Sequence, residues 1–277
     1  MGGTVYHAYR SALILTLLVA ACGAPSTGVQ PMDATPADGG PIRFNPREIS
    51  AESRDCGEPG GKCARIKVNF PETTDGGTAA VRENIDLFIE HDLVSRMRGL
   101  VPEDVGNGIG NVEGLAGAFL AQFRAFVAEF PDATAEWFVE IAATPIYSTS
   151  EVATIDINET AYTGGAHPNS RRRLVSFDLA TGQLLGVDDL TAEFAELTSL
   201  VEHHFRIAQG LESDADLAVA GFWFPEEGFS LPDNVGVVSD GLLFHWDAYE
   251  IAPYSMGPID VTVPVAELAV LVDRSYW

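Results

Sequence analysis

Two short segments of this 277-residue chain hold the polar and aromatic side chains best suited to bind a ligand. In the first, residues 162–169, two adjacent glycines permit a tight or left-handed turn, and a proline holds the preceding His167 in an extended backbone. This pattern predicts a rigid loop that presents Tyr162, His167 and Asn169 to a ligand. A plain hairpin turn, with the histidine packed against a neighbour, is the alternative interpretation.

Three consecutive arginines follow this loop directly. Arg171 to Arg173 form a basic island in an acidic chain, and they would either pair with local carboxylates or hold an anionic group of a ligand. In the second segment, residues 244–257, the rings of Trp246, Tyr249 and Tyr254 are candidates to line a binding groove. Core packing of a loop between strands is the alternative there.

The standard catalytic and cofactor motifs are absent from the sequence. It contains no zinc-protease helix motif, no nucleophile elbow and no phosphate-binding glycine loop. None of the five histidines beyond residue 21 pairs with another at metal-ligand spacing with a third ligand at hand. The sequence therefore predicts no catalytic residue, no metal site and no cofactor.

Hydrophobic periodicity indicates the elements that must position the two segments. Alternating apolar residues predict strands, the first of them ended by Pro71, at 65–70, 137–146, 152–162, 171–177, 236–238, 242–246 and 259–263. Apolar stripes with a helical period predict helices over 78–98, about 115–130 and 190–205, and a short one after Pro264. Strands and helices are mixed without a regular alternation, which favours the α+β class with mixed or antiparallel sheets, packed helices and two adjoining subdomains.

The start of the chain has the pattern of a lipoprotein signal peptide over residues 1–21. Arg10 precedes an apolar run about half as long as the roughly 20 residues that a membrane-spanning helix needs. The residues before Cys22 resemble the lipobox, so we expect cleavage there and lipid on the cysteine; an ordinary signal peptide with a chance cysteine is the alternative. Gly23 favours an outer-membrane location, facing the periplasm or the cell surface. Residues 22–42, rich in small residues and proline, would form a flexible tether.

Two further cysteines, Cys56 and Cys63, flank a segment of turn residues. In an exported protein such a pair is most simply a disulfide that closes a hairpin. A metal site would need two more ligands, which no nearby histidine or cysteine supplies.

The balance of charge is strongly acidic, with 16 Lys and Arg against 40 Asp and Glu and a formal net charge of −24. Such a surface repels phosphate backbones and anionic lipid head groups, which argues against a nucleic acid partner. It would attract cationic partners, or it reflects adaptation to a salty habitat. The composition leaves both explanations open.

Several motifs, in order and at sensible spacing, resemble the extracellular domain family shared by the anti-sigma factor RsiV and the peptidoglycan deacetylase PdaC. The segments are 162–167, 177–182 and 188–190, then 239–244, 249–254, Gly257 and 261–264. The resemblance covers about 65–272. It implies a first domain within 43–184 and a second within 185–277.

The resemblance also implies a class of function. In the deacetylase, catalysis belongs to a separate metal-dependent domain, and in RsiV the comparable domain is similar to a receptor for lysozyme. We therefore expect a non-catalytic binding module of the cell envelope, held on the membrane through its lipid, that recognises lysozyme or a peptidoglycan-related cell-wall glycan. An envelope hydrolase or glycan-modifying enzyme without a recognisable motif is the alternative, and a purely structural envelope component is a third.

Overall fold

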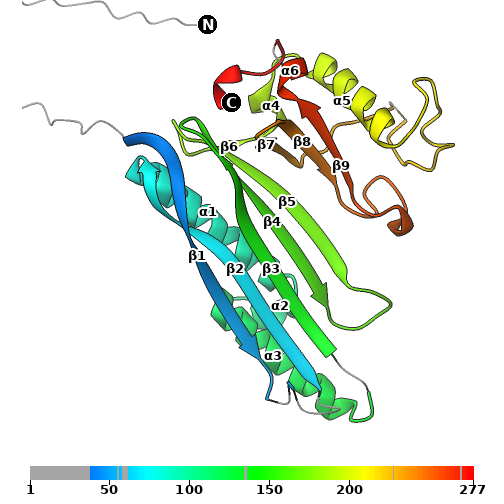
Figure 1. Cartoon of the computed structure of the whole chain (residues 1–277). Helices are drawn as coiled ribbons and strands as arrows, with labels where there is room; N and C mark the ends of the chain where they lie inside the picture. The colour runs from blue at the N-terminus through cyan, green and yellow to red at the C-terminus, as the bar shows by residue number, and fades with distance from the viewer. Residues whose placement is uncertain (1–37, 55, 58–61, 134–135, 227, 269) are drawn as a thin grey trace, which may run out of the picture. The chain divides into compact units, whose positions relative to one another are not determined.

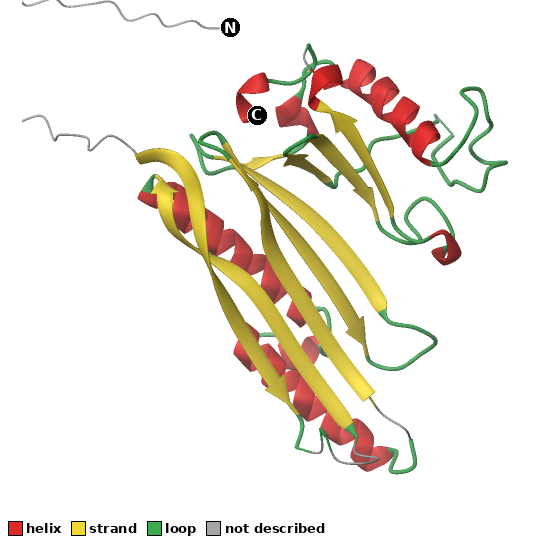
Figure 2. Cartoon of the chain, viewed as in Figure 1, coloured by secondary structure: helices red, strands yellow, loops and turns green. Residues whose placement is uncertain are grey.

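The computed structural model describes residues 38–54, 56–57, 62–133, 136–226, 228–268 and 270–277, which belong to one compact unit over 36–277. The predicted signal peptide, the predicted lipidation site Cys22 and the tether up to residue 37 lie outside the described residues. The described part holds a six-stranded sheet, a three-stranded sheet and several helices (Figures 1 and 2). This confirms the predicted α+β class. Among the described helices, none has both the length and the apolar character needed to cross a bilayer.

The larger sheet has the strand order β1-β2-β3-β4-β5-β6. Its members are β1 (Asp38–Glu52), β2 (Cys63–Gly77), β3 (Glu136–Ser148), β4 (Val152–Tyr162), β5 (Asn169–Asp178) and β6 (Leu184–Leu185). The pair β2–β3 is parallel and the other neighbours are antiparallel, so the sheet is mixed. A parallel pair requires a crossover, which α1 (Ala79–Arg98), α2 (Glu103–Gly106) and α3 (Val112–Glu129) provide.

The three helices of the crossover all lie on one face of the larger sheet (Figure 2). Thr78 caps α1 by accepting a hydrogen bond from the Val81 N–H, and Asn111 caps α3 in the same way. The apolar stripe of α1 is buried at the helical period and packs into the first hydrophobic core, through Val81, Ile85, Ile89, Leu93 and Met97. The predicted helices over these regions are confirmed.

The hairpin of β1 and β2 carries the predicted disulfide between Cys56 and Cys63. The two strands pair in antiparallel fashion, and the bond links Cys63, the first residue of β2, to Cys56 in the connection that follows β1. Strand β1 begins at Asp38, before the predicted end of the tether at residue 42. Ile42 is buried in the first core, which explains why this stretch is ordered against the sheet.

The prediction that Pro71 ends its strand is wrong, because β2 continues to Gly77. Pro71 lies directly opposite Pro46 of β1, so this pair needs no backbone hydrogen bond from either residue. On its other side, β2 is paired with β3 only as far as Asn69. The missing N–H of Pro71 therefore removes no bond from the sheet.

The smaller sheet has the order β7-β8-β9, formed by Val235–Val238, Gly241–Trp246 and Ile259–Pro264. The remaining elements are α4 (Val187–Leu190), α5 (Phe194–Ala208), η1 (Tyr254–Met256), α6 (Val265–Leu268) and η2 (Arg274–Tyr276). Helix α5 packs on this sheet, and Phe205 and Trp246 meet in a second hydrophobic core. The predicted strands of this region and the short helix after Pro264 are confirmed, but the helix predicted over 190–205 begins only at Phe194, because α4 ends at Leu190 and the residues between are not helical.

Candidate functional site

Strands β4 and β5 divide their side chains between the two faces of the larger sheet. Side chains alternate along a strand, and residues directly opposite one another share a face. Glu159 and its partner Arg171 point to the helix-covered face. Asn158 and Thr160 belong to the other face, together with their partners Arg172 and Ser170.

On the helix-covered face, the arginine island is neutralised by local carboxylates. Glu159, of which 4% is exposed, binds Arg171 at 3.0 Å and Arg96 of α1 at 3.3 Å. Asp92 of α1 binds Arg96 at 2.6 Å and Arg173 at 2.7 Å. These contacts match the alternative in which the arginines pair locally.

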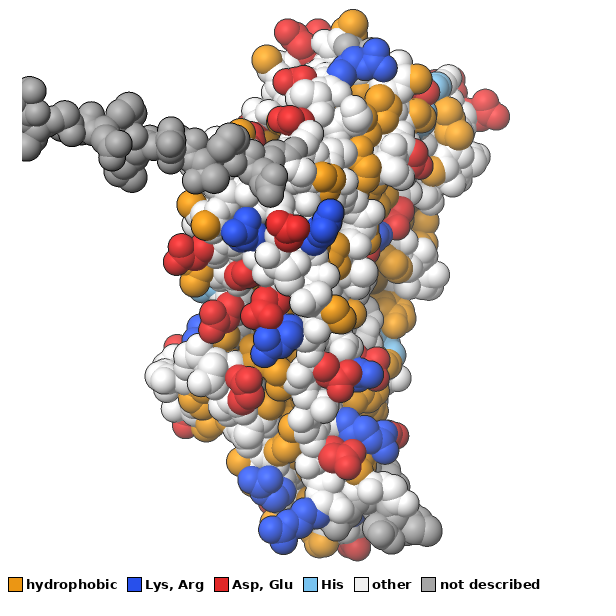
Figure 3. All heavy atoms as spheres, turned by 60° about the vertical axis from the view of Figure 1, so that its left-hand side comes forward, with side chains coloured by type: hydrophobic (Ala, Val, Ile, Leu, Met, Phe, Trp, Pro, Cys, Tyr) orange, Lys and Arg blue, Asp and Glu red, His pale blue; other side chains and the backbone are white. Residues whose placement is uncertain are grey.

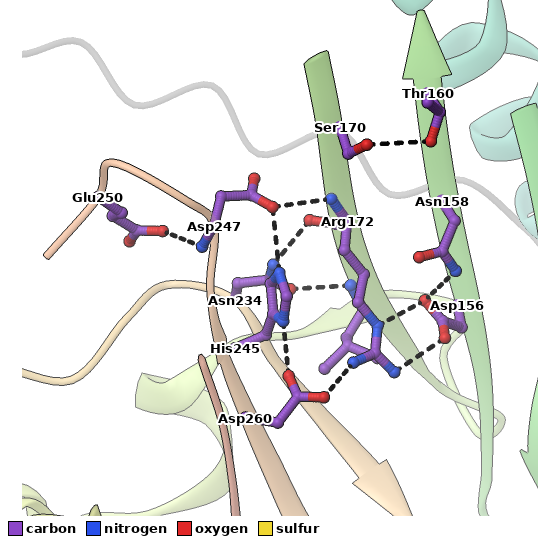
Figure 4. Close-up of polar contacts among 11 residues, drawn as sticks. Asp156, Asn158, Thr160, Ser170, Arg172, Asn234, His245, Asp247, Glu250 and Asp260 are labelled. Carbon is purple, nitrogen blue, oxygen red and sulfur yellow. Dashed lines mark hydrogen bonds and ion pairs between the residues drawn. The ribbon is translucent and has the colours of Figure 1, made fainter. Parts of the chain in front are cut away.

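On the open face, a second ionic cluster joins the two sheets (Figure 4). The Arg172 guanidinium donates two hydrogen bonds to Asp156 of β4, both 2.9 Å, and a third of 2.7 Å to Asp260 of β9. His245 of β8 lies 2.6 Å from Asp260 through Nδ1 and 3.1 Å from Asp247 through Nε2. Arg172 and His245 therefore share the Asp260 carboxylate.

The electrostatics of this cluster favour a charged His245. Burial lowers the pKa of its imidazole, since only 3% of the residue is exposed, but hydrogen bonds and attraction from Asp247 and Asp260 outweigh burial and raise the pKa to about 9. Burial likewise opposes the charge on Asp260, yet His245 and Arg172 lower the pKa of this carboxyl below its ordinary value. At neutral pH both ring nitrogens of His245 donate.

The smaller sheet also satisfies the backbone of β5 along its outer edge. The side-chain amide of Asn234 accepts a 2.8 Å hydrogen bond from the Leu174 N–H and donates one of 2.8 Å to the Arg172 carbonyl (Figure 4). Asp247 accepts the Arg172 N–H at 3.0 Å. These side chains replace a neighbouring strand and cover an otherwise open sheet edge.

A groove of about 630 Å³ lies between the open face of β4 and β5 and the loop over 247–258. Its floor holds Asn158, Thr160 and Ser170, and the hydroxyls of the last two share a 3.1 Å hydrogen bond. The loop contributes a mainly apolar wall, and the ionic cluster closes one end. The wall residues include Ala248, Tyr254, Met256 and Pro258.

The two segments singled out in the sequence meet beside this groove, which Tyr254 lines and His167 and Tyr249 do not. The packing of His167 against a neighbouring ring matches the alternative of a plain hairpin turn. His167 stacks on Tyr254 with ring centroids 4.0 Å apart and an angle of 16°, and Tyr254 is followed by Tyr249 at 5.4 Å. Tyr249 is 57% exposed and, among the described residues, is the one non-glycine with a positive φ, +71°. A bulky residue held in that region stores strain, which marks binding sites more often than plain loops.

The other predicted site residues have different surroundings. The Tyr162 hydroxyl donates to the Gly165 carbonyl at 2.9 Å and stabilises the loop from within. Asn169 begins β5 and is exposed. Trp246 is 1% exposed and packs in the second core, so the prediction that it lines a groove is wrong. Strand alternation places its ring on the inner side of β8.

Three floor residues, Asn158, Thr160 and Ser170, were not among the residues predicted from the sequence. Their signal was present, since they are polar positions of alternating strands. Such positions usually face solvent and carry no function. Only the arrangement of the loop over 247–258 beside this face turns them into the floor of a groove.

The polar side chains of the groove are largely bonded to one another. Its cationic side chains Arg172 and His245 both lie in ion pairs with carboxylates. The hydroxyls of Thr160 and Ser170 bond to each other, without a histidine as a base. Within the described residues, no cluster of three or more metal-ligating side chains is present.

The larger mixed sheet with one helix-covered face, joined to a smaller sheet, defines an α+β fold that recurs in two crystal structures. A DUF3298-family protein from Bacteroides fragilis superposes with a TM-score of 0.68 at 18% identity, covering 86% of this chain and 96% of that one. One from Pseudomonas aeruginosa gives 0.59 at 19% identity, covering 85% and 97%. At such identities the likeness establishes the fold.

Sequence comparison matches part of the chain to a family model. Residues 187–266 match the family model described as protein of unknown function (DUF3298). The peptidoglycan-N-acetylmuramic acid deacetylase PdaC of Bacillus subtilis is 22% identical over 135 residues, which are 47% of this chain but only 28% of the deacetylase. The predicted resemblance to the RsiV/PdaC-like family is confirmed, and the chain carries a DUF3298 domain of unknown function.

Proposed function

We propose that this protein is a lipid-anchored, non-catalytic module of the cell envelope that binds a peptidoglycan-related ligand in the groove. One observation carries the proposal. The groove sets an uncharged polar floor opposite a loop of exposed aromatic and apolar side chains. A concave site with a few convergent polar groups and apolar walls is the usual form of a small-molecule or glycan site. The partial relationship to a peptidoglycan deacetylase supports the choice of ligand.

The pKa shifts of the carboxyl groups near the groove favour a binding function over hydrolysis. A general acid at neutral pH needs a raised pKa, but attraction from His245 and Arg172 lowers that of Asp260 in the groove. Burial raises the pKa of the Glu250 carboxyl, yet this side chain accepts the backbone N–H of Asp247 and belongs to an exposed residue. Neither group is placed as an acid–base pair across the groove.

Lysozyme is the second candidate ligand, and the net charge of −24 favours it. Opposite charge speeds the encounter with a cationic protein. On the face shown in Figure 3, however, acidic and basic side chains are interspersed, so no single acidic patch stands out there. Long-range attraction of this kind brings proteins together but does not select one orientation.

Binding of the mature lipoprotein, held in detergent micelles, to purified peptidoglycan sacculi tests the proposal. Tyr254→Ala removes the ring that joins the two loops, and we expect about tenfold weaker retention on sacculi. Phe194→Ala truncates a ring of similar exposure on α5, outside the groove, and should leave retention unchanged. Equal retention of both variants and the wild type would place binding elsewhere. A parallel titration with lysozyme at low and high salt tests the second candidate.

A further inference from the structure

We infer that the groove takes a neutral sugar chain that carries acetamido groups, in preference to an anionic or cationic ligand. This inference rests on the proposed function and names the chemical class of its ligand. Three features of the groove support it: compensated charges, uncharged hydrogen-bonding groups, and an apolar wall opposite a polar floor.

The charges that line the groove are already compensated. Arg172 pairs with both Asp156 and Asp260. His245 completes the set by bridging Asp260 and Asp247. A charged ligand would compete with these partners, and removing one member of a partly buried ion pair leaves the other uncompensated. A neutral ligand meets no such penalty.

The hydrogen-bonding groups that the floor of the groove leaves for a ligand carry no charge. In the contact between Thr160 and Ser170 only one hydroxyl donates, so the other retains a hydrogen for a partner. The Asn158 amide donates to Asp156 at 2.9 Å through its nitrogen, which leaves its carbonyl oxygen facing the groove as an acceptor. Together these groups offer a donor and an acceptor to hydroxyl and amide substituents of a sugar.

The groove has one apolar side and one polar side, which suits a sugar because its ring also has apolar and polar parts. A pyranose exposes C–H groups on its faces and hydroxyls around its rim, and an acetamido group adds a methyl beside an amide. Tyr254 and Met256 of η1 provide the apolar side, and Asn158 with Ser170 provides the polar one. The η1 loop turns back at Gly257, whose φ of +72° suits glycine.

An extended peptide fits this site less well. Peptides recognised by a sheet usually add a strand at an open edge, where backbone groups are free to pair. The edge of β5 beside the groove is already covered, because Asn234 bonds both Arg172 and Leu174 and Asp247 bonds Arg172. The groove lies on a face of the sheet, where side chains are presented to a ligand and backbone groups are not free to pair with a peptide.

Titration of the mature protein with three oligosaccharides of equal length tests the inference. The tetramer of N-acetylglucosamine is neutral, its fully de-N-acetylated counterpart is cationic, and tetragalacturonic acid is anionic. We expect saturable binding of the neutral tetramer by calorimetry, with at least about tenfold weaker binding of both charged ones. Tighter binding of either charged tetramer, or no saturable binding of the neutral one at millimolar concentrations, overturns the inference.

Matched variants locate the binding. Asn158→Ala removes the floor acceptor and should weaken the neutral tetramer by about three- to tenfold, the effect of one hydrogen bond. Asn45→Ala changes an exposed asparagine of β1, outside the groove, and should have no effect. Equal affinity of the two variants would overturn the inference. Sacculi that retain the protein while the neutral tetramer fails to bind would refute the ligand class and leave the proposed function standing.

Discussion

The clearest single-residue property of this protein is the charged state of His245. A buried imidazole ordinarily loses its proton, yet two carboxylates within hydrogen-bond reach reverse that tendency. Both carboxylates also bind Arg172, Asp260 through the guanidinium and Asp247 through the backbone N–H. One imidazolium therefore helps hold β8, β9 and β5 together.

This arrangement predicts a pH dependence of stability at the residue scale. The pKa of His245 is about 9 in the folded protein and about 6.5 when unfolded, so its stabilisation is complete below pH 6.5 and is lost as pH rises through 9. We expect a contribution of about 1–2 kcal/mol, after allowance for the half-exposed Asp260. Urea unfolding at pH 6 and pH 9.5 measures it.

The variant His245→Gln should lose most of the decline in unfolding free energy between these pH values. His203→Gln changes an exposed histidine of α5 and should keep it. A wild-type protein equally stable at pH 6 and pH 9.5 would contradict the assignment of charge.

At the scale of elements, the edge of β5 shows how the smaller sheet is attached. Asn234 precedes β7 and supplies the two hydrogen bonds that a neighbouring strand would supply to β5. Farther along β5, the buried Ser176 hydroxyl accepts the Val237 N–H at 2.9 Å and contacts the Thr154 hydroxyl at 2.8 Å. The two sheets are thus held together by hydrogen bonds between side chains of one sheet region and backbone groups of the other.

Removal of the small Asn234 amide should lower the free energy of unfolding substantially. Asn234→Ala leaves the partly buried Leu174 N–H and Arg172 carbonyl without partners, and each unsatisfied group costs about 1–3 kcal/mol. We expect the unfolding free energy to fall by about 2–3 kcal/mol with an unchanged denaturant slope. Asn45→Ala, on an exposed part of β1, is the control. A loss equal to that of the control would mean that water replaces the amide.

Those helices and strands whose apolar residues recur at a regular spacing were predictable from the sequence. The helix α1 and the hairpin of β3 and β4 have strong patterns, and both were predicted close to their observed bounds. Pro71 misled the prediction because the cost of a proline depends on which neighbours the strand has. Trp246 misled it because alternation alone does not say which side of a strand is the inner one.

The sequence predicted the loop side of the groove but neither its floor nor the ionic cluster at its end. The loop residues His167, Tyr249 and Tyr254 stand out by composition, and stacking brings them together. The floor comes from β4 and β5, and the ionic cluster joins Arg172 of β5 to Asp260 of β9, which is 88 residues away in sequence. Contacts of that range depend on how the two sheets meet, and local patterns carry no information about it.

At the scale of the whole molecule, the main prediction concerns attachment to a membrane. The described residues contain no helix able to cross a bilayer, and residues 1–37 lie outside them. The lipobox-like residues before Cys22 predict a diacylated cysteine, and buried acyl chains contribute about 0.8 kcal/mol per methylene. Because one chain gives only marginal binding, two or more are needed to hold the protein stably.

Mass spectrometry and fractionation test this attachment directly. We expect the mature protein to begin at Cys22 with a lipid-modified sulfur, and to partition with membranes. Replacing residues 1–22 with a cleavable signal that lacks the lipobox cysteine should release the same acidic body into the soluble fraction, since it would lack acyl chains. Cys56→Ser with Cys63→Ser removes two cysteines but not the lipid, so this control should stay with membranes. A purified native protein that begins at Met1 with a free thiol at Cys22 would exclude lipid anchoring.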